Sequence, residues 1–152
     1  RLKNYVGDGA VTVPVGPVSD EARHLTTTCK EALDIAVETV RPGINWQEVA
    51  RAMQKHVEAA GCSVVRAFTG HGIGQQMHEE PQLPNYVTKS IGNIVLKEGM
   101  TFAIEPMINA GDYKVKTLSN GWTAVTVDGS LSAHFEHSVA VTKDGAMVLT
   151  AA

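Results

Sequence analysis

The sequence predicts an α+β fold in which two early helices cover a later antiparallel sheet. Apolar residues recur at steps of three and four between residues 19 and 61, which is the period of amphipathic helices. From residue 93 onward, short runs of β-forming residues alternate with turns that contain glycine. Because helices are grouped early and strands late, the pattern favours α+β over an alternating α/β architecture.

Both expected helices have recognisable ends. The first should begin after Ser19, a residue type that caps helix N-termini, and end at the Arg-Pro-Gly sequence at 41–43. Asn45 should cap the second helix, with Glu48 three residues later completing a capping box. Gly61 is then expected to end this helix.

The strands are expected on both sides of this helical region. Residues 2–15 predict two short strands or one bulged strand, and residues 63–68 predict another. In the second half, the strands are expected at residues 100–107, 122–127 and 132–141.

Two glutamates interrupt the apolar character of these late strands. Glu105 and Glu136 are expected mid-strand, with no Lys or Arg in either strand before Lys143. Alternation of side chains places His134 and Ser138 on the same face as Glu136. A buried carboxylate without a partner is too costly to keep, so each must be solvated, protonated, paired or bound to a metal.

The densest group of chemically active residues lies at 68–84, with the sequence FTGHGIGQQMHEEPQLP. Three glycines surround His71, which predicts a shaped loop there rather than a helix or a regular strand. His78 follows with Glu79 and Glu80, which brings two imidazoles and two carboxyls close together in the chain. A solvated polar loop is the alternative interpretation.

Asp8, His71, Glu105 and Glu136 together form a carboxylate-rich set with one imidazole. This balance of ligands is typical of Mn, Fe, Co or Zn. A structural zinc site would use Cys and His at short spacings, whereas oxygen-rich, scattered ligands are typical of two ions that share bridging carboxylates. The set therefore favours a metal-dependent hydrolase. A structural ion and a buried polar network remain open alternatives.

Composition excludes several other classes. With 152 residues, 43% of them hydrophobic, the chain is expected to form one globular domain. A net charge of -3 and the absence of a basic run argue against a nucleic-acid partner, and no apolar run is long enough to span a membrane. Cys29 and Cys62 show no CxxC spacing and are expected to be reduced core thiols of a cytoplasmic protein.

Four motifs cover nearly the whole chain: VGDGAVTVPVG (6–16), GHGIGQQMHEEP (70–81), GMTFAIEPMIN (99–109) and NGWTAVTVDGSLSAHFEH (120–137). In these motifs the chain resembles an N-terminally truncated type I methionine aminopeptidase. The resemblance implies a pita-bread (creatinase/aminopeptidase-like) fold, present as its C-terminal half plus part of the preceding hairpin. It also implies that residues 1–152 are a metalloaminopeptidase catalytic domain that is incomplete at the N-terminus.

The resemblance further implies two divalent metal ions (Co, Mn, Fe or Zn) as cofactors. Asp8, His71, Glu105 and Glu136 align with the metal ligands of the family, with Asp8 and Glu136 as the bridging ones. The family's remaining ligating aspartate is expected upstream of Asp8, outside the sequence. The chain as given is therefore expected to coordinate the second ion incompletely, to expose surface meant for the other half, and to be inactive or impaired.

Catalytic and substrate-binding roles are also implied by the resemblance. His78 and Glu105 align with catalytic residues, where Glu105 moves a proton and His78 donates to the developing oxyanion. His78, Trp122 and Met77 align with residues that bind the substrate, and Trp122 lies near the methionine pocket in the family.

The implied function is the hydrolytic removal of the N-terminal methionine from nascent polypeptides. The expected partners are the N-terminal peptide of nascent proteins and the ribosome, with no membrane or direct nucleic-acid partner and a monomeric state when complete. The alternatives are an Xaa-Pro aminopeptidase or prolidase-like peptidase of the same fold and a non-catalytic pita-bread binding module.

Overall fold

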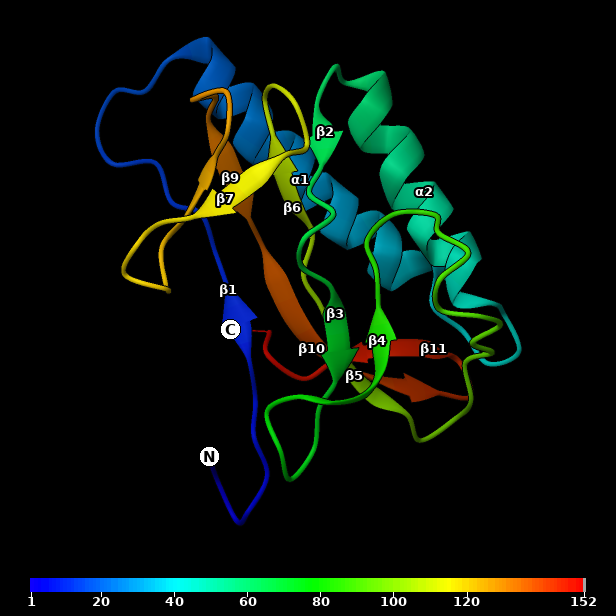
Figure 1. The fold of residues 1–152 in the computed structure, drawn as a ribbon. Helices are drawn as coiled ribbons and strands as arrows, with labels where there is room; N and C mark the ends of the chain where they lie inside the picture. Colours follow the sequence, from blue (N-terminus) through cyan, green and yellow to red (C-terminus); the bar gives the residue numbers. More distant parts are fainter. Residues whose placement is uncertain (152) are drawn as a thin grey trace.

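The structure, a computed structural model, describes residues 1–151, in which two helices cover one side of a curved antiparallel sheet (Figure 1). Six strands form this main sheet, and β11 (Gly145–Val148) pairs only with β10. The other five lie in the spatial order β1 (Gly9–Ala10), β10 (Glu136–Thr142), β5 (Thr101–Ile104), β3 (Gly70–Gly72) and β4 (Glu79–Leu83). The central strands therefore come from distant parts of the sequence.

Two smaller groups of strands complete the described part of the chain. A three-stranded sheet contains β2 (Ser63–Val64), β6 (Met107–Asn109) and β9 (Ser132–His134) in that order. A hairpin is formed by β7 (Val115–Thr117) and β8 (Ala124–Thr126). The predicted early helices and late antiparallel strands are thus confirmed.

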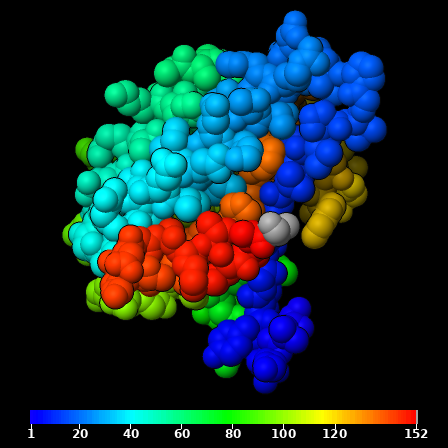
Figure 2. Space-filling view, turned by 180° about the vertical axis from the view of Figure 1, so that it is seen from behind, coloured from blue at the N-terminus to red at the C-terminus, as the bar shows by residue number. Residues whose placement is uncertain are grey.

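The helices begin where their capping residues predict. In α1 (Asp20–Thr39), the Ser19 hydroxyl accepts a hydrogen bond from the backbone N–H of Ala22 at 3.1 Å. In α2 (Trp46–Ala59), Asn45 and Glu48 form the predicted capping box. Seen from behind, α1 and α2 cover the sheet, while the first residues of the chain project away from the body (Figure 2). No helix among residues 1–151 is long and apolar enough to cross a membrane.

Trp46 and Cys29 join the helices to the strands that carry the glutamates. Trp46 is fully buried, packs edge to face on Phe102 of β5 at 5.6 Å between ring centroids, and donates a hydrogen bond to the Pro84 carbonyl. The Cys29 thiol in α1 donates to the carbonyls of Pro106 and Ala133. Burial raises the pKa of Cys29 to about 12, so this thiol stays protonated. Cys29 and Cys62 are buried free thiols, as predicted.

The expected strands at 100–107 and 132–141 are each broken in two. The first divides into β5 and β6 around Glu105 and Pro106, and the second into β9 and β10 at Phe135. Pro106 has no N–H to continue a ladder, and the two halves of each run join different sheets. The mid-strand placement of the two glutamates was therefore wrong: Glu105 follows β5, and Glu136 is the first residue of β10.

Three other strand predictions were too long. The run at 63–68 is a strand only at Ser63–Val64, and the run at 122–127 only at Ala124–Thr126. Within residues 2–15, the structure forms β1 and an isolated bridge between Leu2 and Tyr5. These segments contain β-forming residues, but a residue joins a strand only where a neighbouring backbone pairs with it.

The prediction of a loop at His71 was also wrong, because His71 lies in β3 between β4 and β5. The flanking glycines permit close approach of neighbouring backbones. A Cβ on Gly70 would lie 2.5 Å from the carbonyl oxygen of Ala103, and one on Gly72 would lie 2.3 Å from that of Glu80. Glycine is thus required here by interior strand packing rather than by a turn.

Candidate metal centre

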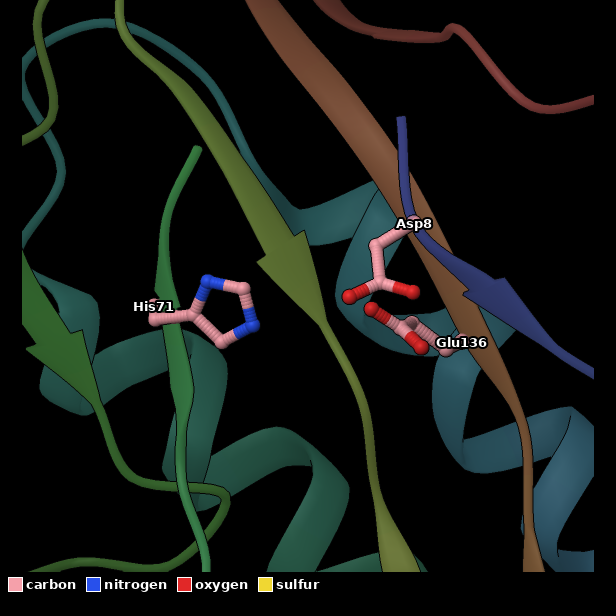
Figure 3. A group of neighbouring side chains, drawn as sticks. All are labelled: Asp8, His71 and Glu136. Carbon is pink, nitrogen blue, oxygen red and sulfur yellow. The ribbon is translucent and has the colours of Figure 1, made fainter. Parts of the chain in front are cut away.

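The order of strands in the main sheet brings Asp8, His71 and Glu136 together. Asp8 directly precedes β1, His71 lies in β3, and Glu136 begins β10. One ligand atom from each of these side chains lies within 4.8 Å of the others. Figure 3 shows the carboxylates of Asp8 and Glu136 beside one another, with the His71 ring turned toward them.

Asp8 is held in place by its backbone. Its N–H donates to the hydroxyl of Ser138 at 3.0 Å, and that hydroxyl donates to the Asp8 carbonyl at 2.8 Å. Ser138 lies two residues after Glu136 in β10, and Ala10 pairs with Glu136. The same strand therefore carries Glu136 and fixes the segment that carries Asp8.

Glu105 lies between two imidazoles. Its Oε1 is 3.4 Å from Nε2 of His71, and its Oε2 is 3.5 Å from Nε2 of His134. Glu105, His134 and Glu136 form a second group whose ligand atoms lie within 4.8 Å of one another. The structure thus brings all four predicted ligands together, and Glu136 belongs to both groups.

The spacing of these atoms is that of ligands to a common ion. Hydrogen bonds between nitrogen and oxygen are normally about 2.7–3.2 Å long, so 3.4 and 3.5 Å are too long for good ones. Ligand atoms at about 2.1 Å from a tetrahedral ion lie about 3.4 Å apart. The arrangement therefore fits a divalent cation better than a direct hydrogen-bond network.

His71 is oriented as a metal-binding imidazole. Its Nδ1 lies 2.9 Å from the Gly72 carbonyl, which can only accept, so Nδ1 donates. The Nε2 lone pair is then directed toward the carboxylates when the ring is neutral. Such an N–H to carbonyl bond is the usual way in which a protein fixes the tautomer of a ligating histidine.

The electrostatics of the cluster also favour a cation. Burial first, and then the charges of Asp8 and Glu105, raise the pKa of Glu136 from 4.5 to about 7, while His134 acts in the opposite direction. Glu136 is only 5% exposed, and its Oε1 has no hydrogen-bond partner within residues 1–151. In this part of the chain no Lys or Arg forms an ion pair with the three carboxylates. A divalent cation would balance the negative charge of these carboxylates.

A cleft of about 590 Å³ opens beside the cluster. His71, Glu105 and His78 are among its lining residues, together with Phe68 and Met107. The exposed His78 ring stands edge to face on the His71 ring, with centroids 4.4 Å apart. An imidazole is thus available at the cleft within reach of a molecule that contacts the cluster of carboxylates.

The other two predicted substrate-binding residues are not lining residues of this cleft. Trp122 lies in the turn between β7 and β8 and is 90% exposed. Met77 is exposed on the segment between β3 and β4. The structure therefore brings His78, but neither Trp122 nor Met77, to the cleft among the residues it describes.

His134 is a member of the cluster that the sequence hypothesis did not include. The signal was present, because alternation placed His134 on the same face as Glu136 two residues later. A single histidine on a strand is weak evidence of a ligand, however, and only the approach of Glu105, between β5 and β6, shows its place in the cluster.

Residues 1–143 match the family model of metallopeptidase family M24. Since this match covers nearly the whole chain, the chain belongs to metallopeptidase family M24. Membership in a family of metallopeptidases implies a divalent metal, in agreement with the cluster of potential ligands.

Within that family, the chain is similar to methionine aminopeptidases. It is 46% identical to methionine aminopeptidase 1 of Bacillus subtilis over 150 residues, and 47% identical to the methionine aminopeptidase of Escherichia coli K12 over 146 residues. These matches cover 99% and 96% of the chain but 60% and 55% of the two relatives. The chain thus spans somewhat more than half the length of these relatives.

Solved structures agree with this relationship. The methionine aminopeptidase of Thermotoga maritima superposes with a TM-score of 0.94 at 45% identity, covering 99% of this chain and 60% of that one. A prolidase of Thermococcus sibiricus superposes with a TM-score of 0.74 at 30% identity, covering 98% and 35%. The predicted pita-bread fold and the resemblance to methionine aminopeptidases are confirmed.

The raised pKa of Glu136 predicts a pH-dependent loss of stability in the metal-free chain. The folded state binds the proton of the Glu136 carboxyl more tightly than the unfolded state does. Protonation of Glu136 therefore stabilises the fold fully below about pH 4.5, and this stabilisation is lost as the pH rises through about 7. At about 1.4 kcal/mol per pKa unit, the loss is about 3 kcal/mol. Urea unfolding in EDTA should show this pH dependence in the difference between the unfolding free energies of the wild type and Glu136→Gln. A free-energy difference independent of pH would contradict the raised pKa of Glu136.

Proposed function

We propose that residues 1–152 belong to the catalytic domain of a methionine aminopeptidase, which removes the N-terminal methionine from nascent polypeptides in the cytoplasm. The observation that carries this proposal is the pair of ligand groups that share Glu136 beside a cleft containing His78. High identity to methionine aminopeptidases supports this substrate class over that of the more distant prolidases.

We propose two ions of Co, Mn, Fe or Zn as the cofactors. Asp8, His71, Glu105 and Glu136 would hold them; Glu136 belongs to both ligand groups, and Asp8 belongs to the group of His71. When bound, such ions supply Lewis acidity and lower the pKa of water, which permits peptide hydrolysis near neutral pH. The buried Glu136 and the tautomer of His71 preorganise the site for this charge.

The roles of the remaining residues follow from their places at the cleft. His78 is exposed there and can donate a hydrogen bond to the carbonyl oxygen of the first peptide bond as negative charge develops. Glu105 reaches both the cleft and the cluster, so its carboxylate can take a proton from water and pass it to the departing amine. Trp122 and Met77 do not line the cleft, so their proposed contact with the methionyl side chain rests on their positions in the sequence motifs alone.

The partner in this proposal is the free N-terminus of a newly made polypeptide, met at the ribosome. The cleft is open and lined partly by Phe68 and Met107, which suits an extended peptide end with an apolar first residue. Because the chain spans 60% of its Bacillus subtilis relative, we expect the 152-residue chain alone to act more slowly than that full-length relative.

The test is hydrolysis of Met-Ala-Ser and of Ala-Pro by the metal-loaded chain. We expect release of methionine from the first peptide and negligible cleavage of the second. His78→Ala should lower kcat about 100-fold, because one donor to the oxyanion is lost, while metal content measured by atomic emission stays the same.

His24→Ala is the matched control, since His24 lies in α1 and contacts the Ala60 carbonyl far from the cleft. Preferential cleavage of Ala-Pro would indicate a prolidase-like enzyme. Loss of metal in His78→Ala would assign that residue to the ligands.

A further inference from the structure

We infer that His134 is a second imidazole ligand of the metal centre, which binds through Nε2 the ion that Glu105 and Glu136 also contact. This inference rests on the proposed metal centre and adds to it a ligand that the sequence hypothesis left out. His134 ends β9, two residues before Glu136, and its Nε2 lies 3.5 Å from Oε2 of Glu105.

The nitrogen of His134 is buried without a partner. Although the side chain is 36% exposed, Nε2 itself is shielded from solvent and accepts or donates no hydrogen bond within residues 1–151. Oε1 of Glu136, on a residue that is 5% exposed, is unpartnered in the same way. The two residues belong to one group whose ligand atoms lie within 4.8 Å of one another, and buried polar atoms in folded proteins usually have a partner.

The backbone of His134 is fixed in the orientation that this role requires. The Thr12 hydroxyl donates to the His134 carbonyl at 2.8 Å, and the His134 N–H donates to that hydroxyl at 2.9 Å. On its other side, His134 pairs with Met107 of β6. Two other segments of the chain therefore fix the backbone from which the ring extends, as a preorganised ligand needs.

The two imidazoles occupy corresponding places on either side of Glu105. His71 faces Oε1 of that carboxylate and His134 faces Oε2, at 3.4 and 3.5 Å. Both imidazoles belong to ligand groups that contain Glu136. Each of two ions would thus have one imidazole and would share Glu136. Nitrogen ligation selects first-row ions such as Zn, Co or Fe over Mg and Ca at both positions.

The test is a titration of the chain with Co²⁺, followed by calorimetry and by the visible absorption of bound cobalt. His134→Gln keeps a hydrogen-bond donor of similar reach but removes the imidazole. We expect it to weaken one of two binding events by more than the about 10- to 100-fold that loss of a merely supporting partner costs, and to alter the cobalt spectrum of that event. Wild-type affinity and spectrum in this variant would overturn the inference and leave His134 as a hydrogen-bond donor.

His137→Gln is the matched control, because His137 lies in the same strand as Glu136 but its Nδ1 contacts the Thr150 hydroxyl. A second measurement needs no variant. The proton NMR spectrum of the cobalt-loaded wild type should show contact-shifted ring protons from two histidines, and signals from one alone would refute ligation by His134.

These outcomes separate the inference from the proposed function. If the wild type takes up no cobalt, the metal centre itself is wrong. If His71→Gln weakens cobalt binding and His134→Gln does not, the metal centre stands and only the role of His134 is overturned. Thermal melts followed by circular dichroism confirm that each variant is folded before it is titrated.

Discussion

Replacing Glu136 with glutamine is expected to lower the affinity of the chain for divalent ions by about 10³-fold or more. Glu136 belongs to both ligand groups, so its loss removes a ligand from every ion in the centre. Loss of a residue that only hydrogen-bonds to a metal ligand lowers metal affinity about 10- to 100-fold. Loss of a ligand that two ions share should lower it more. Competition of the variant with a zinc-binding dye measures the change.

The same substitution should not weaken the metal-free fold near neutral pH. Glutamine removes the charge whose burial raises the pKa of Glu136 to about 7, so above that pH the variant should be at least as stable as wild type in EDTA. Loss of affinity without loss of stability therefore identifies a ligand. Glu98→Gln, in the exposed turn before β5, is the control and should bind metal normally. Wild-type affinity in Glu136→Gln would contradict the proposed centre.

Gly72→Ala is expected to destabilise the chain by about 3 kcal/mol, at the upper end of ordinary overpacking. The new Cβ would lie 2.3 Å from the carbonyl oxygen and 2.8 Å from the carbonyl carbon of Glu80, which are backbone atoms of the paired strand. β3 or β4 must then move, and the neighbouring His71 moves with it. Urea unfolding should show the loss of stability, and metal titration should show weaker binding.

Gly74→Ala provides a matched control in the same segment. The three atoms nearest to a Cβ at Gly74 would be those of the Glu79 carboxylate, at 3.0 to 3.2 Å, and that flexible side chain can turn away. The control should lose less than about 1 kcal/mol. Equal unfolding midpoints for the two alanine variants would show that the glycine at 72 is not needed for close strand packing.

The helices could be predicted because their ends depend on local chemistry. Ser19 and Asn45 each cap the backbone within three residues of themselves, and the apolar period of each helix lies within one segment. The breaks at Pro106 and Phe135 could not be predicted in this way. They depend on which sheet the chain joins next, and that choice is made by partners far away in sequence.

The candidate site was also predictable only in part, because the residue types are local but their positions in space depend on distant strand pairing. Residue types selected Glu105 and Glu136, since unpaired carboxylates in apolar company need a partner, and the sequence motifs added Asp8 and His71 to the set. Their convergence depends on the order β1, β10, β5 and β3 in the main sheet. His134 joins the cluster through the same distant pairing. The surface positions of Trp122 and Met77 depend on the packing of two turns, which their motifs do not specify.

The most direct test of the proposed centre is anomalous diffraction from crystals of the chain grown with Zn²⁺. Two peaks are expected, both about 2.0–2.2 Å from carboxylate oxygens of Glu136, one also near His71 and the other near Glu105. Zinc bound elsewhere, with no peak within coordination distance of Glu136, would contradict it.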